Sequence, residues 1–182
     1  NKSVPVYSPN KNINHTTNVA VDGDLISFDF IDFHVIETPG HTLDHIVFYN
    51  QNNNILFSGD SLFRLGCGRV FEGTYKQMYD SLIKIFQLNN KTLVYCGHEY
   101  TLNNLNFLLS IFPNNEDLNK ERKIIKEQLI TNGKTIPFNL GLEKKLNPFL
   151  STESEFFKTY KLSKNLSDIE MFSYLRDLKN NF

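Results

Sequence analysis

The chain has 182 residues, 40% of them hydrophobic, which is enough for one sizeable core and a small second domain. Its 19 Lys and Arg residues nearly balance 20 Asp and Glu residues, so no basic surplus indicates nucleic-acid binding. No apolar run approaches the roughly 20 residues of a membrane span, and Cys67 and Cys96 are too few for a disulfide framework. We therefore expect a globular protein with reduced cysteines that binds neither nucleic acid nor membrane. We expect a cytoplasmic location, with an organellar form left open.

The first half of the chain is rich in strand signals. Apolar and alternating runs separated by polar turns predict strands at residues 18–24, 25–38, 46–49, 55–58 and 92–96. Residues 61–74 contain Gly66, Gly68 and Gly73 without a clean period, which predicts a loop. Apolar residues at three- and four-residue spacing predict a helix over 75–87.

The second half of the chain changes to helical patterns. Helices are predicted at residues 102–112, 116–131, 152–160 and 166–179. The stretch 136–149 contains two prolines and a glycine and is predicted to be irregular. Strands followed by helices indicate an α/β domain over residues 1–105 and a helical domain over residues 106–182.

Three polar residues follow glycines at the ends of predicted strands. They are His41 after Gly40, Asp60 after Gly59, and His98 after Gly97. Each alone has an ordinary explanation as a turn or packing residue. Strands that end in glycine turns can, however, direct such side chains to one point above a sheet. Imidazole and carboxylate together suit zinc, iron or manganese, so the three residues are candidate metal ligands.

Several longer motifs together resemble those of glyoxalase II, the hydroxyacylglutathione hydrolase family of the metallo-β-lactamase superfamily. They are Thr-Pro-Gly-His-Thr-x-x-His at 38–45, Phe-Ser-Gly-Asp-Ser-Leu-Phe at 57–63, Gly-Cys-Gly-Arg at 66–69, Cys-Gly-His-Glu-Tyr-Thr at 96–101 and Asn-Pro-Phe at 147–149. The resemblance covers nearly the whole chain. It implies a metallo-β-lactamase-type αββα sandwich, incomplete at its N-terminus, followed by a C-terminal α-helical domain.

The resemblance also implies a chemistry. Two divalent metal ions, zinc first and iron or manganese as alternatives, would be held in part by His41, Asp60 and His98. Asp60 would bridge both ions and take part in catalysis. A metal-activated hydroxide would hydrolyse S-(2-hydroxyacyl)glutathione, such as S-lactoylglutathione, to glutathione and a 2-hydroxy acid. This is a step of methylglyoxal detoxification.

The substrate side of the resemblance involves seven residues. Glutathione would be bound by Arg69, Val70, Phe71, Tyr100, Asn104, Arg176 and Lys179. Arg176 and Lys179 are three residues apart and therefore share one helix face. On spacing alone this pair is an ordinary solvated face, and only the resemblance gives it a binding role.

One family motif is not found in the sequence. The Thr-His-x-His-x-Asp-His motif should precede His41, and neither His15 nor His34 has neighbours that could replace it. We interpret the chain as an N-terminally truncated portion of the enzyme and expect these 182 residues alone to be inactive. One alternative is a non-catalytic fragment that associates with the missing N-terminal piece or with a second copy. Another is a different hydrolase or oxygenase of the superfamily, such as a persulfide dioxygenase, a lactonase or an RNA-processing nuclease.

Overall fold

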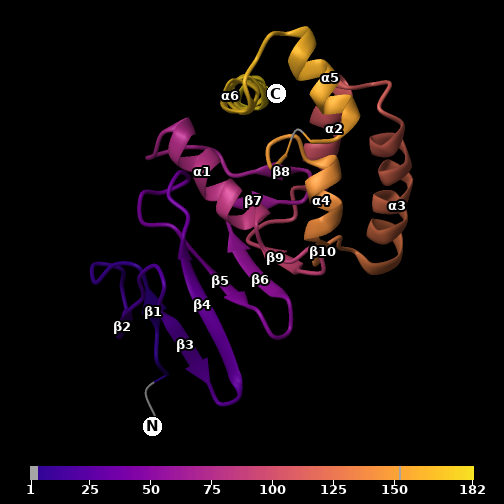
Figure 1. The fold of residues 1–182 in the computed structure, drawn as a ribbon. Helices are drawn as coiled ribbons and strands as arrows, with labels where there is room; N and C mark the ends of the chain where they lie inside the picture. The colour runs from indigo at the N-terminus through magenta and orange to yellow at the C-terminus, as the bar shows by residue number, and fades with distance from the viewer. Residues whose placement is uncertain (1–3, 152) are drawn as a thin grey trace.

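A computed structural model describes residues 4–151 and 153–182, and a six-stranded mixed sheet lies at its centre (Figure 1). The strand order is β10-β9-β6-β5-β4-β3. The strands are β3 (Leu25–Phe28), β4 (Ile31–Glu37), β5 (Ile46–Asn50), β6 (Ile55–Gly59), β9 (Leu93–Cys96) and β10 (Phe138–Asn139). Within this sheet only β6 and β9 pair in parallel, because helix α1 (Tyr75–Phe86) connects them as a crossover. The predicted α/β class is confirmed.

Two small strand pairs flank the sheet. One joins β1 (Tyr7–Ser8) to β2 (Asn18–Val19), and the other joins β7 (Leu62–Phe63) to β8 (Gly66–Cys67). The second pair falls inside the stretch 61–74, where a loop was predicted, so that prediction was wrong at its start. Two-residue strands carry too few side chains to produce a detectable alternation.

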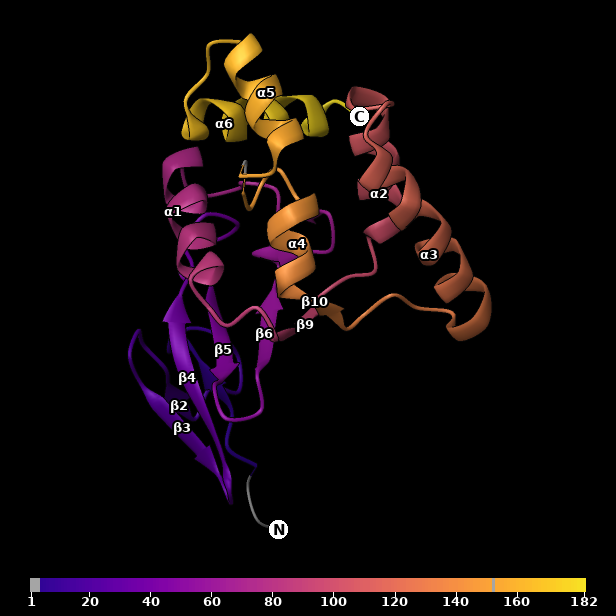
Figure 2. The ribbon, with the colours of Figure 1, turned by 45° about the vertical axis from the view of Figure 1, so that its right-hand side comes forward.

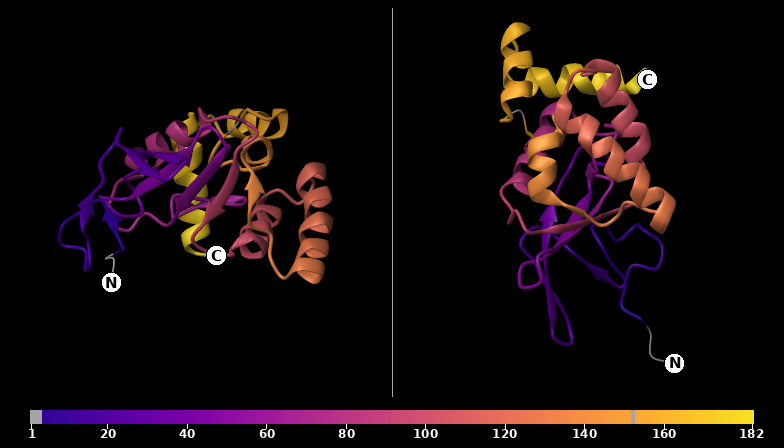
Figure 3. Two further views of the ribbon diagram at one scale, coloured as in Figure 1. Left: turned by 90° about the horizontal axis from the view of Figure 1, so that it is seen from below. Right: turned by 90° about the vertical axis from the view of Figure 1, so that its right-hand side faces the viewer.

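The helices form two groups. They are α1, α2 (Thr101–Ile111), α3 (Glu116–Asn132), α4 (Leu140–Leu146), α5 (Glu155–Ser163) and α6 (Asp168–Asn180). Helices α1 and α4 cover one face of the sheet, α2, α5 and α6 gather beyond its upper end, and α3 lies on the side of β10 (Figures 1 and 2). Seen from below, β1 and β2 lie on one side of the molecule and α3 on the opposite side (Figure 3).

One hydrophobic core connects the sheet to the helices. It joins Val47 and Leu56 of the sheet to Met78 of α1, Leu140 of α4 and Phe172 of α6, all of which are buried. The predicted division between residues 105 and 106 falls inside α2 and stays a prediction. No helix in residues 4–151 and 153–182 is long and apolar enough to cross a membrane.

The opposite face of the sheet carries an aromatic row, formed by Phe28, Phe33, Phe57 and Tyr95. Their rings touch in sequence, with centroid separations of 6.3, 5.7 and 5.5 Å. Phe28 and Phe57 are each 45% exposed. Contiguous exposed apolar side chains of this kind are typical of an interaction surface.

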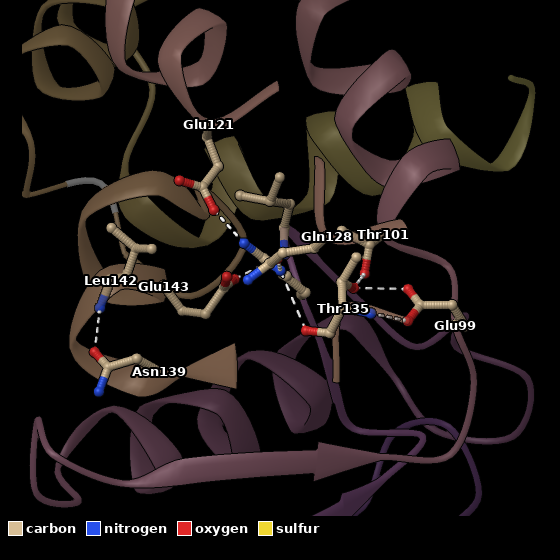
Figure 4. A network of polar contacts seen from close by, with 10 residues as sticks. Glu99, Thr101, Glu121, Gln128, Thr135, Asn139, Leu142 and Glu143 are labelled. Atoms are coloured by element: carbon tan, nitrogen blue, oxygen red, sulfur yellow. Dashed lines mark hydrogen bonds and ion pairs between the residues drawn. The ribbon is translucent and has the colours of Figure 1, made fainter. Parts of the chain in front are cut away.

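Helix α4 lies in the stretch that was predicted to be irregular, so that prediction was also wrong. Its first turn is capped by Asn139, whose Oδ1 accepts the Leu142 N–H at 3.0 Å (Figure 4). Gly141 lies inside the helix because its backbone packs against the Asn90 carbonyl, where a Cβ would stand only 2.8 Å away. Tertiary packing therefore outweighs the low helix propensity of glycine at this position.

Candidate metal centre and substrate pocket

The ends of three strands bring His41, Asp60 and His98 together. His41 follows β4, Asp60 follows β6, and His98 follows β9. The Nε2 atoms of His41 and His98 lie 3.3 and 3.5 Å from the same carboxylate oxygen, Oδ2 of Asp60. The parallel pairing of β6 and β9 explains part of this arrangement, since parallel neighbours end at the same edge of a sheet.

The ring of His41 is oriented by a backbone group. Its Nδ1 lies 2.8 Å from the Arg69 carbonyl oxygen, which can only accept, so Nδ1 carries the hydrogen. In the neutral imidazole, Nε2 then presents a lone pair to the Asp60 carboxylate. A lone pair and a carboxylate oxygen repel each other unless a cation lies between them, and this donor set suits a divalent metal ion. In the described residues no group of three or more His, Cys, Asp and Glu side chains is arranged so that it could hold a metal ion, so ligation by these three residues stays a prediction.

His45 holds the backbone of Asp60. The Asp60 N–H donates to His45 Nε2 at 3.1 Å, and His45 Nδ1 lies 2.8 Å from Thr38 Oγ1 and 3.0 Å from Ser61 Oγ. Burial, together with the neighbouring His41, lowers the pKa of His45. A neutral His45 therefore fits its role as acceptor for the Asp60 amide.

Two glycines allow the chain to pack closely around Asp60. A Cβ at Gly68 would lie 1.9 Å from the Asp60 carbonyl oxygen, and one at Gly97 would lie 2.5 Å from its Oδ1. No side chain fits at either position. The glycine before His98, which belongs to the sequence pattern, therefore has a steric cause.

A pocket of about 510 Å³ is lined by two residues that contact candidate ligands, since the Arg69 carbonyl accepts from His41 and the Tyr100 ring stacks on His98. It is lined by Phe63, Cys67, Arg69, Tyr100, Asn103, Asn104, Arg176, Lys179 and Asn180. Five of the seven predicted substrate residues are among them. Val70 and Phe71 lie outside this lining, and the Phe71 ring packs 5.1 Å from the His41 ring. Their binding roles, like those of the other five, stay predictions.

The polar groups of the pocket have different surroundings. Arg176 is only 5% exposed, and its guanidinium donates to the Cys67 carbonyl at 3.0 Å and to Asn180 Oδ1 at 3.1 Å. Asn104 is also 5% exposed and donates to the Arg64 carbonyl at 3.0 Å. Both side chains therefore hold backbone as well as lining the pocket.

Lys179 is more accessible than Arg176. Its ammonium donates to the Asn103 carbonyl at 3.2 Å and lies 5.1 and 4.9 Å from the ring centroids of Phe107 and Phe182. Burial, and then repulsion by Arg176, lower the pKa of Lys179 to about 8. Its charge therefore changes within the pH range in which enzymes are commonly assayed.

The two cysteines have the properties of packing residues. Cys67 is buried and burial raises the pKa of its thiol. Burial likewise raises the pKa of Cys96 to about 11, and its thiol donates a hydrogen bond to the His98 carbonyl. Thiolate is scarce at both positions near neutral pH, so neither residue has the character of a nucleophile.

Glu99 and Thr135 support the end of β9, and Thr135 lies in no sequence motif that would indicate this role. Glu99 accepts the Thr135 N–H at 2.7 Å and its hydroxyl at 2.8 Å, and Thr101 touches the same hydroxyl (Figure 4). Burial alone would raise the pKa of Glu99, but hydrogen bonds from Thr135 and Thr101 outweigh it and lower the pKa. Next to this support, the Tyr100 ring stacks on His98 at 4.9 Å.

Comparison with solved structures and family models defines the class of the protein. Residues 3–98 match the family model described as the metallo-beta-lactamase superfamily. The crystal structure of ETHE1 from Myxococcus xanthus superimposes with a TM-score of 0.57 and 24% identity, over 97% of this chain and 66% of that one. A metallo-beta-lactamase from Staphylococcus aureus gives a TM-score of 0.54 and 24% identity, over 93% and 45% respectively. The fold is that of the metallo-β-lactamase superfamily, as predicted.

Sequence relatives narrow this class to one family. Residues 99–182 match the family model described as hydroxyacylglutathione hydrolase C-terminus. The hydroxyacylglutathione hydrolases of Nitrosomonas eutropha and a Marinomonas species are 42% and 45% identical to the chain, which spans 72% of the length of each. They cover 99% and 98% of this chain. The chain belongs to the hydroxyacylglutathione hydrolase, or glyoxalase II, family, and the resemblance found in its motifs is confirmed.

Proposed function

We propose that the site serves the hydrolysis of an S-(2-hydroxyacyl)glutathione thioester to glutathione and a 2-hydroxy acid. The observation that carries this proposal is family membership, with 40–45% identity to hydroxyacylglutathione hydrolases over nearly the whole chain. The enzyme type is thus a glyoxalase II thioester hydrolase. The pocket beside His41, Asp60 and His98 has the cationic and amide groups that a ligand with two carboxylates requires.

Each group of the chain has a distinct task in this proposal. His41 and His98 offer nitrogen ligands, and Asp60 offers the oxygen ligand between them. The Arg69 carbonyl keeps the His41 ring oriented, and His45 keeps the Asp60 backbone in place. Arg69 and Lys179 bind the carboxylates of glutathione, whose thiol has a pKa near 8.5 and leaves without a strong acid.

The superfamily indicates a divalent metal ion, and we propose two, with zinc first and iron or manganese as alternatives. The support is the donor set of two imidazole nitrogens and one carboxylate. When bound, the metal supplies a Lewis acid for the thioester carbonyl and lowers the pKa of water.

Replacement of Asp60 tests the proposed metal site. Asp60→Asn keeps the shape of the side chain but removes its charge, and we expect the zinc affinity of the chain to fall by about 100-fold or more. Hydrolysis of S-lactoylglutathione should fall by a similar factor in the protein fused to an upstream segment with the Thr-His-x-His-x-Asp-His motif. Asp29→Asn, in the exposed turn between β3 and β4, is the matched control and should change neither. Equal zinc affinity in the two variants would exclude Asp60 as a ligand.

The activity of the 182 residues themselves is a separate proposal. Only five histidines occur in the sequence, and none forms a His-x-His pair. We expect little hydrolysis by this chain alone, and hydrolysis after fusion to an upstream segment with the Thr-His-x-His-x-Asp-His motif. Turnover by the chain alone would show that the metal ligands present in these 182 residues suffice for hydrolysis. If neither protein hydrolyses S-lactoylglutathione, the proposed reaction is wrong.

Association through the sheet is also proposed, either with an N-terminal segment supplied separately or with a second copy. The aromatic row supports it, because Phe28 and Phe57 leave apolar surface exposed. Light scattering at micromolar concentration tests self-association. A dimer that Phe57→Ser dissociates would support it, and a monomer at all concentrations would exclude it.

A further inference from the structure

The hairpin formed by β7 and β8 is held from outside by buried polar side chains. Leu65 at its tip has a φ of 59°, a left-handed conformation that costs free energy for a residue with a branched side chain. Four backbone groups of the hairpin pair with side chains of the helical segments. These pairs are Arg64 O with Asn104 Nδ2 at 3.0 Å, Leu65 N with Glu143 Oε2 at 2.7 Å, Gly66 O with Asn147 Nδ2 at 3.0 Å and Cys67 O with Arg176 at 3.0 Å.

Glu143 and Asn147 form the centre of this support. They are 1% and 0% exposed, and Glu143 Oε2 accepts both the Leu65 N–H and the Asn147 amide, the latter at 3.1 Å. Figure 4 shows Glu143 from α4 turned toward the same cluster as Glu121 and Gln128 of α3. Burial raises the pKa of Glu143 to about 8, so a neutral amide in its place would keep the required acceptor.

The hairpin leads directly into the candidate metal centre. Gly68, the residue after β8, packs so closely on the Asp60 carbonyl that a Cβ would lie 1.9 Å from it. The next residue, Arg69, accepts the His41 Nδ1 hydrogen at 2.8 Å. Phe63, Cys67 and Arg69 also line the pocket. Any displacement of the hairpin therefore moves one wall of the pocket and the group that orients His41.

We propose that Glu143 and Asn147 are positioning residues of this site, which fix the β7–β8 hairpin and thereby the Arg69 carbonyl that orients His41. Neither residue lines the pocket, and their side-chain hydrogen bonds join them to each other, to the backbone of residues 63–66 and to Phe149. Their effect on substrate is transmitted through the backbone of residues 65–69. This inference rests on the proposed function only in taking glutathione as the ligand of the pocket.

The test compares variants that remove the support with variants that keep it. Asn147→Ala leaves the Gly66 carbonyl without its donor, and Glu143→Met removes the acceptor at nearly constant volume. Glu143→Gln retains an oxygen for the Leu65 N–H and is the conservative rescue. Asn115→Ala is the matched control, since Asn115 is also a buried asparagine but caps α3 through the Leu118 N–H.

Two readouts are needed, and neither requires added metal. Calorimetry gives the Kd of S-methylglutathione, and long-range ¹H–¹⁵N spectra report the Nδ1 resonance of His41. We expect Asn147→Ala and Glu143→Met to raise Kd by about tenfold and to shift that resonance. Glu143→Gln and Asn115→Ala should leave both unchanged, although Asn115→Ala lowers the melting temperature.

The outcomes separate positioning from a purely stabilising role. Folded Asn147→Ala and Glu143→Met proteins with unchanged Kd and His41 resonance would overturn the proposal. Loss of folding in both would assign the residues to stability alone and would overturn it as well. If the wild-type chain does not bind S-methylglutathione, the proposed function loses its ligand, while the His41 resonance still decides the positioning role.

Discussion

The charge of Lys179 is set by its surroundings. Its pKa of about 8 lies below the ordinary 10.5, because burial and Arg176 disfavour the ammonium form. The folded state therefore binds this proton more weakly than the unfolded chain does. The penalty that Lys179 places on folding is present below pH 8 and is relieved as pH rises from about 8 to 10.5.

A pH dependence of ligand affinity follows from this residue. We expect the affinity for S-methylglutathione to be constant below about pH 7. Above pH 8 the affinity should fall by as much as about tenfold for each pH unit, because Lys179 loses its proton. Calorimetry between pH 6.5 and 9.5 measures this profile. Lys179→Arg stays charged throughout and reports the titration of the ligand itself. A profile identical in the two proteins would mean that Lys179 does not contact a carboxylate.

At the same scale, residues differ in how far their position could be predicted. Glycines before His41, Asp60 and His98 singled out three side chains that do converge, although their metal-binding role stays a prediction. Thr135 and Glu143 carry no such signal, since a threonine in a loop and a glutamate in a short helix are common everywhere. Their tasks arise only from segments brought together by folding.

Helix α6 carries two of the three basic residues of the pocket, Arg176 and Lys179, and its start is fixed by its own sequence. Ser167 and Glu170 form a capping box, in which the Glu170 carboxylate accepts the Ser167 N–H at 2.8 Å. The serine hydroxyl in turn accepts the Glu170 N–H at 3.4 Å. This pattern lies at the opposite end of α6 from Arg176 and Lys179, so the cap and the pocket can be perturbed separately.

Removal of the cap should cost stability but not affinity. We expect Ser167→Ala to lower the free energy of unfolding by about 1 kcal/mol, with the Kd of S-methylglutathione within about twofold of wild type. Urea unfolding and calorimetry measure the two effects. Ser173→Ala is the control, because its hydroxyl bonds the Ile169 carbonyl inside α6 and its loss should be nearly neutral. Equal stability of both variants would contradict the capping role.

Elements with a strong local pattern were predictable, and those defined by tertiary contacts were not. The predicted helix at 75–87 is found as Tyr75–Phe86, and its capping box at Thr74 and Gln77 lies within the local sequence. Helix α4 was missed because Gly141 and the nearby prolines indicate irregular structure. Its seven residues are held by core contacts of Leu140 and Leu146, which no local window reveals. The Asn139 cap is a local signal, but the glycine and prolines around it outweigh it.

At the scale of the whole molecule, a buried ion pair connects α3 to the β7–β8 hairpin. Arg64 and Glu121 are 4% and 5% exposed and contact each other directly. The Arg64 guanidinium also donates to Gln128 Oε1 at 2.7 Å and to the Thr135 carbonyl at 3.2 Å. The hairpin thus meets α3 and the segment that follows α3 at one guanidinium, carried by the residue that precedes Leu65 at the hairpin tip.

The free energies of this pair should be strongly non-additive. Arg64→Met leaves the Glu121 carboxylate buried without its partner, and Glu121→Met does the same to Arg64, so each single variant should lose about 3–5 kcal/mol of unfolding free energy. In the double variant neither charge is buried, and we expect it to be more stable than the sum of the single losses predicts, by about 2 kcal/mol or more. Urea unfolding of all four proteins measures the coupling.

The control is an exposed ion pair on the same helix, tested with Lys120→Met and Asp117→Ala, which should show a coupling below about 1 kcal/mol. Additive losses at Arg64 and Glu121 would mean that the pair is solvated in solution, and that α3 is not tied to the hairpin through it.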